Sequence, residues 1–193
     1  MKNIVQLFFI AILALTTTFD SYAQGKNYYS AGNLDASALA SWGKNADGSG
    51  TTPANFDKGD IFHVSATHNM TMSTSWTLGS TGSKHPSIIV EGTLTNSGTI
   101  ENATTLTLTI DGTLTNNGTI TNTTTGVIGG TGTIINGATG TLNIAGTISI
   151  STLTATASGN TVNYTGAAQS VIATTYSNLG LSGSGEKTIS TGT

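Results

Sequence analysis

The chain has 193 residues, only 8% of them charged, and six Lys+Arg against nine Asp+Glu give a formal net charge of −3. All six cations are lysines, so the chain lacks the dense, arginine-rich face that phosphate binding needs, which argues against nucleic acid as a partner. It has no cysteine and therefore neither disulfides nor a thiolate metal site. Its low charge and its many β-branched residues, threonine above all, indicate an all-β chain rather than a disordered one.

Residues 1–23 have the pattern of a secretory signal peptide. Lys2 gives a positive start, residues 4–15 form an apolar run, and the small residues Ser21 and Ala23 suit cleavage before Gln24. The apolar run is shorter than the ~20 residues that span a bilayer, so cleavage is favoured over a transmembrane anchor. We therefore predict a secreted or outer-cell-surface protein with no transmembrane segment after cleavage.

Residues 24–60 are predicted to form an irregular N-terminal cap that precedes the repeats. A short helical turn is expected over residues 35–42, with Asp35 as its cap and with Leu39 and Trp42 on one side. A cluster of turn-forming residues follows at 45–50. Strand-like segments recur from Ile61 onward.

The sequence then repeats at an interval of 20 residues. Residues 90–100 (VEGTLTNSGTI) and 110–120 (IDGTLTNNGTI) match in kind or identity at ten of eleven positions. Self-similarity at this period is the signature of a solenoid, because each short strand needs a neighbouring coil to bury its apolar side. Stacking would place Leu94 over Leu114 and Ile100 over Ile120 in parallel sheets about 4.8 Å apart. We predict a parallel β-helix, or β-solenoid, over residues 61–193.

Asparagine and glycine are expected at the corners of this solenoid. Asn96 and Asn116 share a column, which Asn136 extends, and their side-chain amides are expected to bond along the axis. The Asn-x-Gly sequences suit corners with positive φ, where these residues are least strained. A low-complexity linker is the first alternative, but leucine, isoleucine and valine are too regularly placed for it. A β-sandwich is the second alternative, but it requires longer strands and more aromatic core residues than this chain has.

The motif Gly-Thr-Leu-Thr-Asn-x-Gly-Thr-Ile at 92–100 and 112–120, with the alternating segment 104–110 between the copies, resembles the rungs of filamentous-haemagglutinin-type adhesins. The lead-in at 42–56 and the segment 159–185 look like repetitive secreted surface proteins of Bacteroidetes. These resemblances imply a right-handed parallel β-helix and a role in cell adhesion. Such secreted proteins often carry a C-terminal type IX sorting domain, which this sequence does not show. We therefore expect the repeat array to be truncated at its C-terminal end.

Outward-facing threonines are the candidate binding residues. Thr93, Thr113 and Thr133 are expected in one column, Thr95 and Thr115 in a second, and Thr99, Thr119 and Thr139 in a third, while Thr105, Thr107 and Thr109 share one side of a strand. The predicted binding ladders consist of Thr93, Thr95, Thr113, Thr115, Thr133, Asn96 and Asn116. A flat Thr-x-Thr array also resembles the ice-binding face of β-solenoid antifreeze proteins. The alternative to both binding hypotheses is that threonine is simply a favoured residue at exposed strand positions. The uneven rung lengths also disfavour the long flat lattice that ice binding needs.

Few residues suggest chemistry. Glu91 and Asp111 fall one rung apart and could bind Ca²⁺ or act as a glycosidase pair. The column stops at Thr131 and has no accompanying cation, which favours solvated corner carboxylates. The three histidines, at positions 63, 68 and 85, lack metal-ligand spacing. We predict no metal, no cofactor and no catalytic residue.

The sequence thus favours a non-enzymatic, adhesin-like solenoid whose threonine and asparagine ladders bind surfaces, glycans or neighbouring filaments. An ice-binding solenoid is the first alternative. A polysaccharide-active β-helix enzyme is the second.

Overall fold

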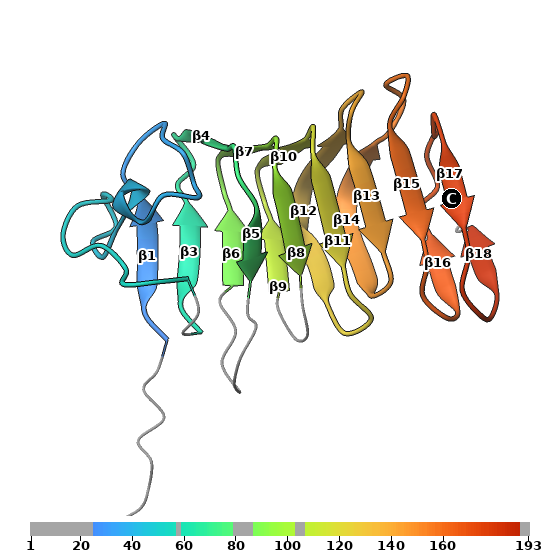
Figure 1. Cartoon of the computed structure of the whole chain (residues 1–193), viewed down its shortest axis with the longest axis horizontal. Coiled ribbons are helices and arrows are strands. Elements are labelled where there is room, and N and C mark those ends of the chain that lie inside the picture. Colours follow the sequence, from blue (N-terminus) through green and yellow to red (C-terminus); the bar gives the residue numbers. More distant parts are fainter. Residues whose placement is uncertain (1–24, 57–58, 79–86, 103–106, 190–193) are drawn as a thin grey trace, which may run out of the picture.

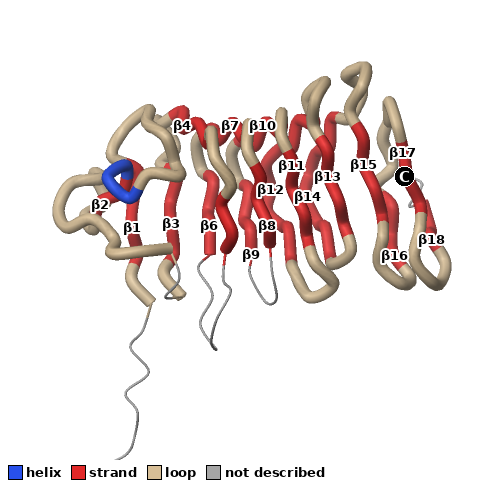
Figure 2. Tube along the Cα trace, viewed as in Figure 1, coloured by secondary structure: helices blue, strands red, loops and turns tan. Residues whose placement is uncertain are grey.

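The computed structural model describes residues 25–56, 59–78, 87–102 and 107–189. These residues form a parallel β-solenoid of about five turns, nearly all of it strand and connecting loop (Figures 1 and 2). The predicted all-β solenoid is confirmed, while its right-handed sense stays a prediction. The predicted signal peptide at 1–23 lies outside the described residues.

Each coil contributes strands to three faces. Face 1 contains β1 (Asn27–Ser30), β3 (Ile61–Val64), β6 (Ser87–Val90), β9 (Thr107–Ile110) and the first parts of β12 (Val127–Asn136) and β14 (Thr147–Thr154). Face 2 contains β4 (Asn69–Met72), β7 (Thr93–Asn96), β10 (Thr113–Asn116) and the second parts of β12 and β14. Face 3 contains β5 (Trp76–Leu78), β8 (Thr99–Asn102), β11 (Thr119–Asn122), β13 (Thr141–Ile144), β15 (Thr161–Tyr164) and β17 (Leu179–Leu181). A separate two-stranded sheet pairs β16 (Gln169–Val171) with β18 (Lys187–Ile189).

The core is a spine of stacked aliphatic side chains. Leu94 pairs directly with Leu114, and Ile100 with Ile120, and all four are fully buried. The strands alternate half-buried and buried positions, because successive side chains of a β-strand point to opposite sides. The register expected from the 20-residue repeat is therefore confirmed.

The N-terminal end is closed by aromatic side chains. Trp42 lies in β2 (Trp42–Gly43), which pairs antiparallel with β1, and its ring lies 5.1 Å from Phe62 and 5.9 Å from Trp76, between centroids. Phe56 packs edge-on against Trp76 at 4.8 Å. Because β1 pairs with β3 in parallel, the first solenoid strand already lies within the predicted cap.

Asp35 stabilises a turn in the N-terminal segment, whereas the sequence predicted that it caps a short helix. The 3-10 helix Leu39–Ser41 follows Ala38 and has no side-chain cap, whereas Oδ1 of Asp35 accepts hydrogen bonds from the backbone N and the hydroxyl of Ser37. Partial burial raises the pKa of the Asp35 carboxyl, but hydrogen bonds from Ser37 and Ser73 outweigh it, so that the pKa is lowered overall. The charged carboxylate is thus favoured in the folded protein.

An asparagine ladder fixes the corner between faces 2 and 3. Nδ2 of Asn96 donates to Oδ1 of Asn116 at 2.9 Å, and Nδ2 of Asn116 donates to Oδ1 of Asn136 at 2.8 Å. This ladder was predicted. A second one joins Asn102 to Asn122 at 2.7 Å and was not, although both residues occupy the column that the same 20-residue offset defines. It begins at Asn102 because the preceding coil has Leu78 at that position.

The corner glycines Gly98 and Gly118 are required for a different reason from the one expected. Neither has a positive φ, so the prediction of left-handed corners is wrong at these positions. A Cβ on Gly118 would lie 2.0 Å from the carbonyl oxygen of Gly98 in the coil below. Stacked corners approach so closely that only a residue without a side chain fits.

Two tyrosines near the C-terminal end give the fold a pH dependence. The Tyr176 hydroxyl donates to the carbonyl of Ile172 at 2.6 Å and lies 3.3 Å from the Tyr164 hydroxyl. Burial, and then the Tyr164 hydroxyl beside it, raises the pKa of Tyr176 above its ordinary value of 10.0. Tyr176 therefore contributes stability that is complete below pH 10, where the unfolded phenol is also neutral, and that is lost as the pH rises further.

We expect the free energy of unfolding to fall between pH 9.5 and 11.5 and to fall less steeply in Tyr176→Phe. Urea titrations at fixed pH values measure both slopes. Equal slopes for the two proteins would contradict the assignment to Tyr176.

Candidate functional site: the threonine face

The outer surface of face 2 presents threonines in two columns. Thr93, Thr113, Thr133 and Thr152 are paired in register in one column, and Thr71, Thr95 and Thr115 in the other. Ile135 follows Thr115 in that second column, and Thr154 follows Ile135. We call the eight residues Thr71, Thr93, Thr95, Thr113, Thr115, Thr133, Thr152 and Thr154 the threonine face. It contains all five threonines that were predicted to bind.

The hydroxyls of the threonine face make no hydrogen bonds to other described residues. Within the part of the chain that the structure describes, no side-chain hydrogen bond involves any of the eight, whereas three other threonine hydroxyls are bonded to backbone carbonyls. Thr123 donates to Asn102, Thr139 to Asn117, and Thr174 to Leu153, at 2.6 to 3.0 Å. Each hydroxyl of the threonine face is therefore available as one donor and two acceptor sites.

The spacing of the threonines is regular in both directions. Parallel pairing sets neighbouring coils ~4.8 Å apart, and alternate residues of one strand lie ~6.6 Å apart. The eight threonines and Ile135 carry no charge, while Asp35 pairs with Thr71 at the N-terminal end of the second column. Ile135, at 37% exposure, adds an apolar contact. The surface is thus a small grid of threonine side chains, each of which carries one methyl and one hydroxyl group.

The third predicted column lies on another face and has a different membership. Thr99 and Thr119 are aligned, but the next member is Thr141, followed by Thr161. Thr139 was predicted here wrongly, because the corner after Asn136 is two residues longer than the corner after Asn116 and shifts the phase. Next to this column run Glu101, Thr121, Asn143 and Asn163. Nδ2 of Asn163 donates to Oδ1 of Asn143 at 2.9 Å, so face 3 carries a charge and bonds between its own side chains.

The predicted presentation of Asn96 and Asn116 to a binding partner is corrected by their burial. Both side chains have no exposed surface, and their amides bond along the solenoid axis and to backbone carbonyls of face 3. A surface ligand cannot reach them. Their ladder instead joins β7, β10 and β12, the strands that carry most of the threonine face.

The third threonine group, at 105, 107 and 109, does not extend this surface. Thr105 lies outside the described residues, and Thr109 lies on face 1 between Ile89 and Gly129 of the neighbouring coils. The outer side of face 1 is therefore mixed in character.

The histidines of the N-terminal coils have structural partners. The His63 ring stacks on Tyr29 at 4.7 Å between centroids, and Nδ1 of His68 lies 2.7 Å from the Ser30 hydroxyl. His85 lies outside the described residues. The described ranges hold no group of three or more metal-ligating side chains.

The carboxylates of Glu91 and Asp111 are directed to opposite neighbours. Glu91 lies 3.7 Å from Nδ1 of His63 in the preceding coil. Asp111 accepts hydrogen bonds from the backbone N and the hydroxyl of Thr131 in the following coil, at 3.0 and 3.1 Å. Each carboxylate therefore contacts a residue of a neighbouring coil, and no contact joins Glu91 to Asp111 as a catalytic or metal-binding pair.

Over the described segments, none of the helices has the length and apolar character needed to cross a bilayer. Comparison of the chain with protein-family models, with curated proteins and with solved structures found no match. The resemblance to filamentous-haemagglutinin-type adhesins, from the motifs at 92–100 and 112–120, therefore stays a prediction. The resemblance to Bacteroidetes surface proteins, from segments 42–56 and 159–185, stays one as well.

Proposed function

We propose that the chain is a non-enzymatic structural β-solenoid, exported to the cell surface or the medium, that adheres to an extended polysaccharide or similar hydroxyl-rich surface through the threonine face. One observation carries the proposal: two in-register columns of threonines whose hydroxyls have no partner in the described protein. Unused donors and acceptors on a rigid support bind without having to give up internal bonds.

Binding of this kind is distributed over the whole face. Each hydroxyl contributes one weak hydrogen bond in water, and each methyl a small apolar contact. Several such contacts held at fixed spacing act together on a ligand that itself repeats, because the first contact raises the effective concentration of the next. The threonine face itself is uncharged, with Asp35 only at its N-terminal end, and this favours neutral ligands such as glycans.

The test is sedimentation of the purified protein with microcrystalline cellulose and with chitin. We expect saturable depletion from solution, weakened about tenfold by Thr113→Tyr, whose bulky ring would stand above the centre of the grid. The matched control is Thr141→Tyr, which changes an outward threonine of face 3. Equal binding by both variants would refute the assignment to the threonine face, and no depletion by either polymer would refute the polysaccharide ligand.

Ice is the second candidate ligand, and the regular two-dimensional spacing of the free hydroxyls favours it. The wild-type protein would slow the growth of ice crystals in a frozen sucrose film, Thr113→Tyr would not, and Thr141→Tyr would behave as wild type. Crystal growth equal to that with serum albumin at the same concentration would refute ice binding and leave the sedimentation result to decide the function.

A further inference from the structure

The stack of strands on face 1 is interrupted once, between β14 and β16. β14 pairs with β12 on one edge, and β16 pairs with β18, but β14 and β16 are not paired with each other. On face 3 the same two coils remain joined through β13 and β15. Figure 1 shows a wider interval between β14 and β16 than between β12 and β14.

The interval is an open cleft with a volume of about 290 Å³. Gly146, Thr147 and Ile148 line one wall, and Ala168, Gln169 and Ser170 line the other. Its start is closed by the Gln169 amide, which donates to the carbonyls of Ile144 and Gly146 at 3.1 and 3.2 Å. Its far end is closed where the Thr174 hydroxyl bonds to Leu153 and where Ala155 bridges Tyr176.

Both walls direct backbone groups into the cleft. The N–H of Thr147 bonds to Gly126 on the β12 side, so the N–H and C=O of Ile148 point the other way, because alternate residues of a parallel strand face opposite neighbours. The N–H of Gln169 bonds to Glu186 on the β18 side, so the N–H and C=O of Ser170 point toward β14. The cleft is thus bordered by two strand edges that face each other.

The core beneath the cleft is incompletely covered. Ile148 is only half-buried, whereas Ile128 and Leu108, its counterparts in the preceding coils of face 1, are fully buried. Ile150, which pairs with Gly130, is also only half-buried. In those coils the next strand covers the inward side chain. The same cover is missing above β14.

We propose that the β14–β16 cleft binds a short extended peptide segment of another protein, which adds a strand parallel to both walls. The two edges fix its backbone direction and its hydrogen bonding, as in other cases of strand addition. The half-buried isoleucines favour apolar side chains at alternate positions of the ligand, and its outward positions are polar, as in the Thr-Leu-Thr-Ile sequence of β9.

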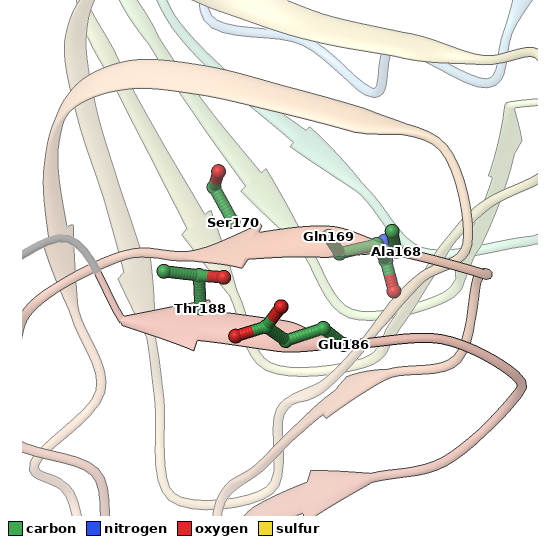
Figure 3. A pocket seen from close by; sticks show the side chains of 5 residues that line it. All are labelled: Ala168, Gln169, Ser170, Glu186 and Thr188. Atoms are coloured by element: carbon green, nitrogen blue, oxygen red, sulfur yellow. The ribbon is translucent and has the colours of Figure 1, made fainter.

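Charge adds one further requirement for the ligand. Ala168, Gln169, Ser170, Glu186 and Thr188 line a second hollow of about 230 Å³ on β16 and β18 (Figure 3). The Lys187 ammonium is occupied by the carbonyls of Gly166 and Ala167, at 3.0 and 2.6 Å. The Glu186 carboxylate has no hydrogen-bond or ion-pair partner among the described residues, so a cation next to the N-terminal end of the peptide would be favoured there.

The experiment uses the purified protein and the fluorescein-labelled peptide acetyl-Lys-Thr-Leu-Thr-Ile-Ser-amide, with fluorescence anisotropy as readout. We expect saturable binding that Ser170→Pro weakens about tenfold, because proline removes the N–H that faces the cleft. Ser170→Ala is the matched control, since it loses the same exposed hydroxyl but keeps the N–H, and it should bind as wild type. A peptide with proline in place of leucine should not bind.

Circular dichroism shows whether Ser170→Pro is folded, and the comparison of the leucine and proline peptides on the wild-type protein keeps the test valid if it is not. Absence of saturable binding to the wild-type protein would overturn the proposal. Equal affinity for the leucine and proline peptides would also overturn it, because strand addition requires the backbone N–H. The residues that line the cleft include none of the eight residues of the threonine face, so either outcome leaves the proposed surface binding to its own test.

Discussion

Replacement of Asn116 by alanine is expected to lower the free energy of unfolding by about 3 kcal/mol or more, which is the larger end of single-residue effects. The Asn116 amide is fully buried and is the central member of its ladder. It accepts from Asn96, donates to Asn136 at 2.8 Å and donates to the Thr141 carbonyl at 3.0 Å. Each buried polar group left without a partner costs about 1–3 kcal/mol, and the lost volume adds a cavity.

The neighbouring Asn117 supplies the control. Its side chain is exposed and, in the described structure, makes no side-chain hydrogen bond, so Asn117→Ala should stay within about 0.5 kcal/mol of wild type. Urea unfolding followed by far-UV circular dichroism measures both variants. Similar midpoints for the two would show that the buried ladder does not stabilise the fold.

The second large effect is expected for Gly118→Ala. The added Cβ would lie 2.0 Å from the Gly98 carbonyl oxygen, which belongs to the backbone of the coil below and cannot turn aside. The coils would have to separate at that corner, and we expect a loss of about 3 kcal/mol or more, at or beyond the upper end of ordinary overpacking.

Gly129→Ala is the matched control for this steric effect. The nearest atom to its added Cβ is a backbone oxygen of Ser149 at 3.6 Å, an ordinary contact, and its φ is not positive. This substitution should be neutral or should stabilise by up to about 1 kcal/mol, since alanine restricts the unfolded chain. A Gly118→Ala protein as stable as Gly129→Ala would mean that the corners are further apart than described.

The two effects bear on function because both act on register. The threonine face exists as a grid only while β7, β10 and β12 stay aligned, and Asn116 and Gly118 fix the corner that follows these strands. A variant that loosens this corner should lose surface binding before it unfolds completely. Surface binding and stability are therefore expected to decline in the same order across these variants.

The sequence was sufficient for the features that depend on its 20-residue period. The pairing of Leu94 with Leu114, the Asn96–Asn116 bonds and the alignment of Thr93 with Thr113 all follow from that interval. The prediction failed at Thr139, because two additional residues in the preceding corner change the offset between coils from 20 to 22 residues. The pairing of Ile120 with Leu142 shows this change.

Other features depend on contacts between coils and leave little trace in local sequence. The crowding at Gly118 is set by the height of a coil rather than by a turn type, and so the expectation of positive φ was wrong there. The burial of Asn96 depends on which side of the corner faces the core. The cleft beside β16 arises because two successive coils pair on face 3, through β13 and β15, whereas their strands β14 and β16 do not pair. The spacing of the sequence repeats does not predict this difference.

The account rests on the stacking of successive coils, and nuclear Overhauser effects between methyl groups test this most directly. In protein with labelled leucine and isoleucine methyls, we predict cross-peaks from Leu94 to Leu114 and from Ile100 to Ile120, because each pair is in register and buried. If these cross-peaks are absent and a soluble paramagnetic agent broadens the Leu114 methyls strongly, the coils do not stack and the threonine face does not form.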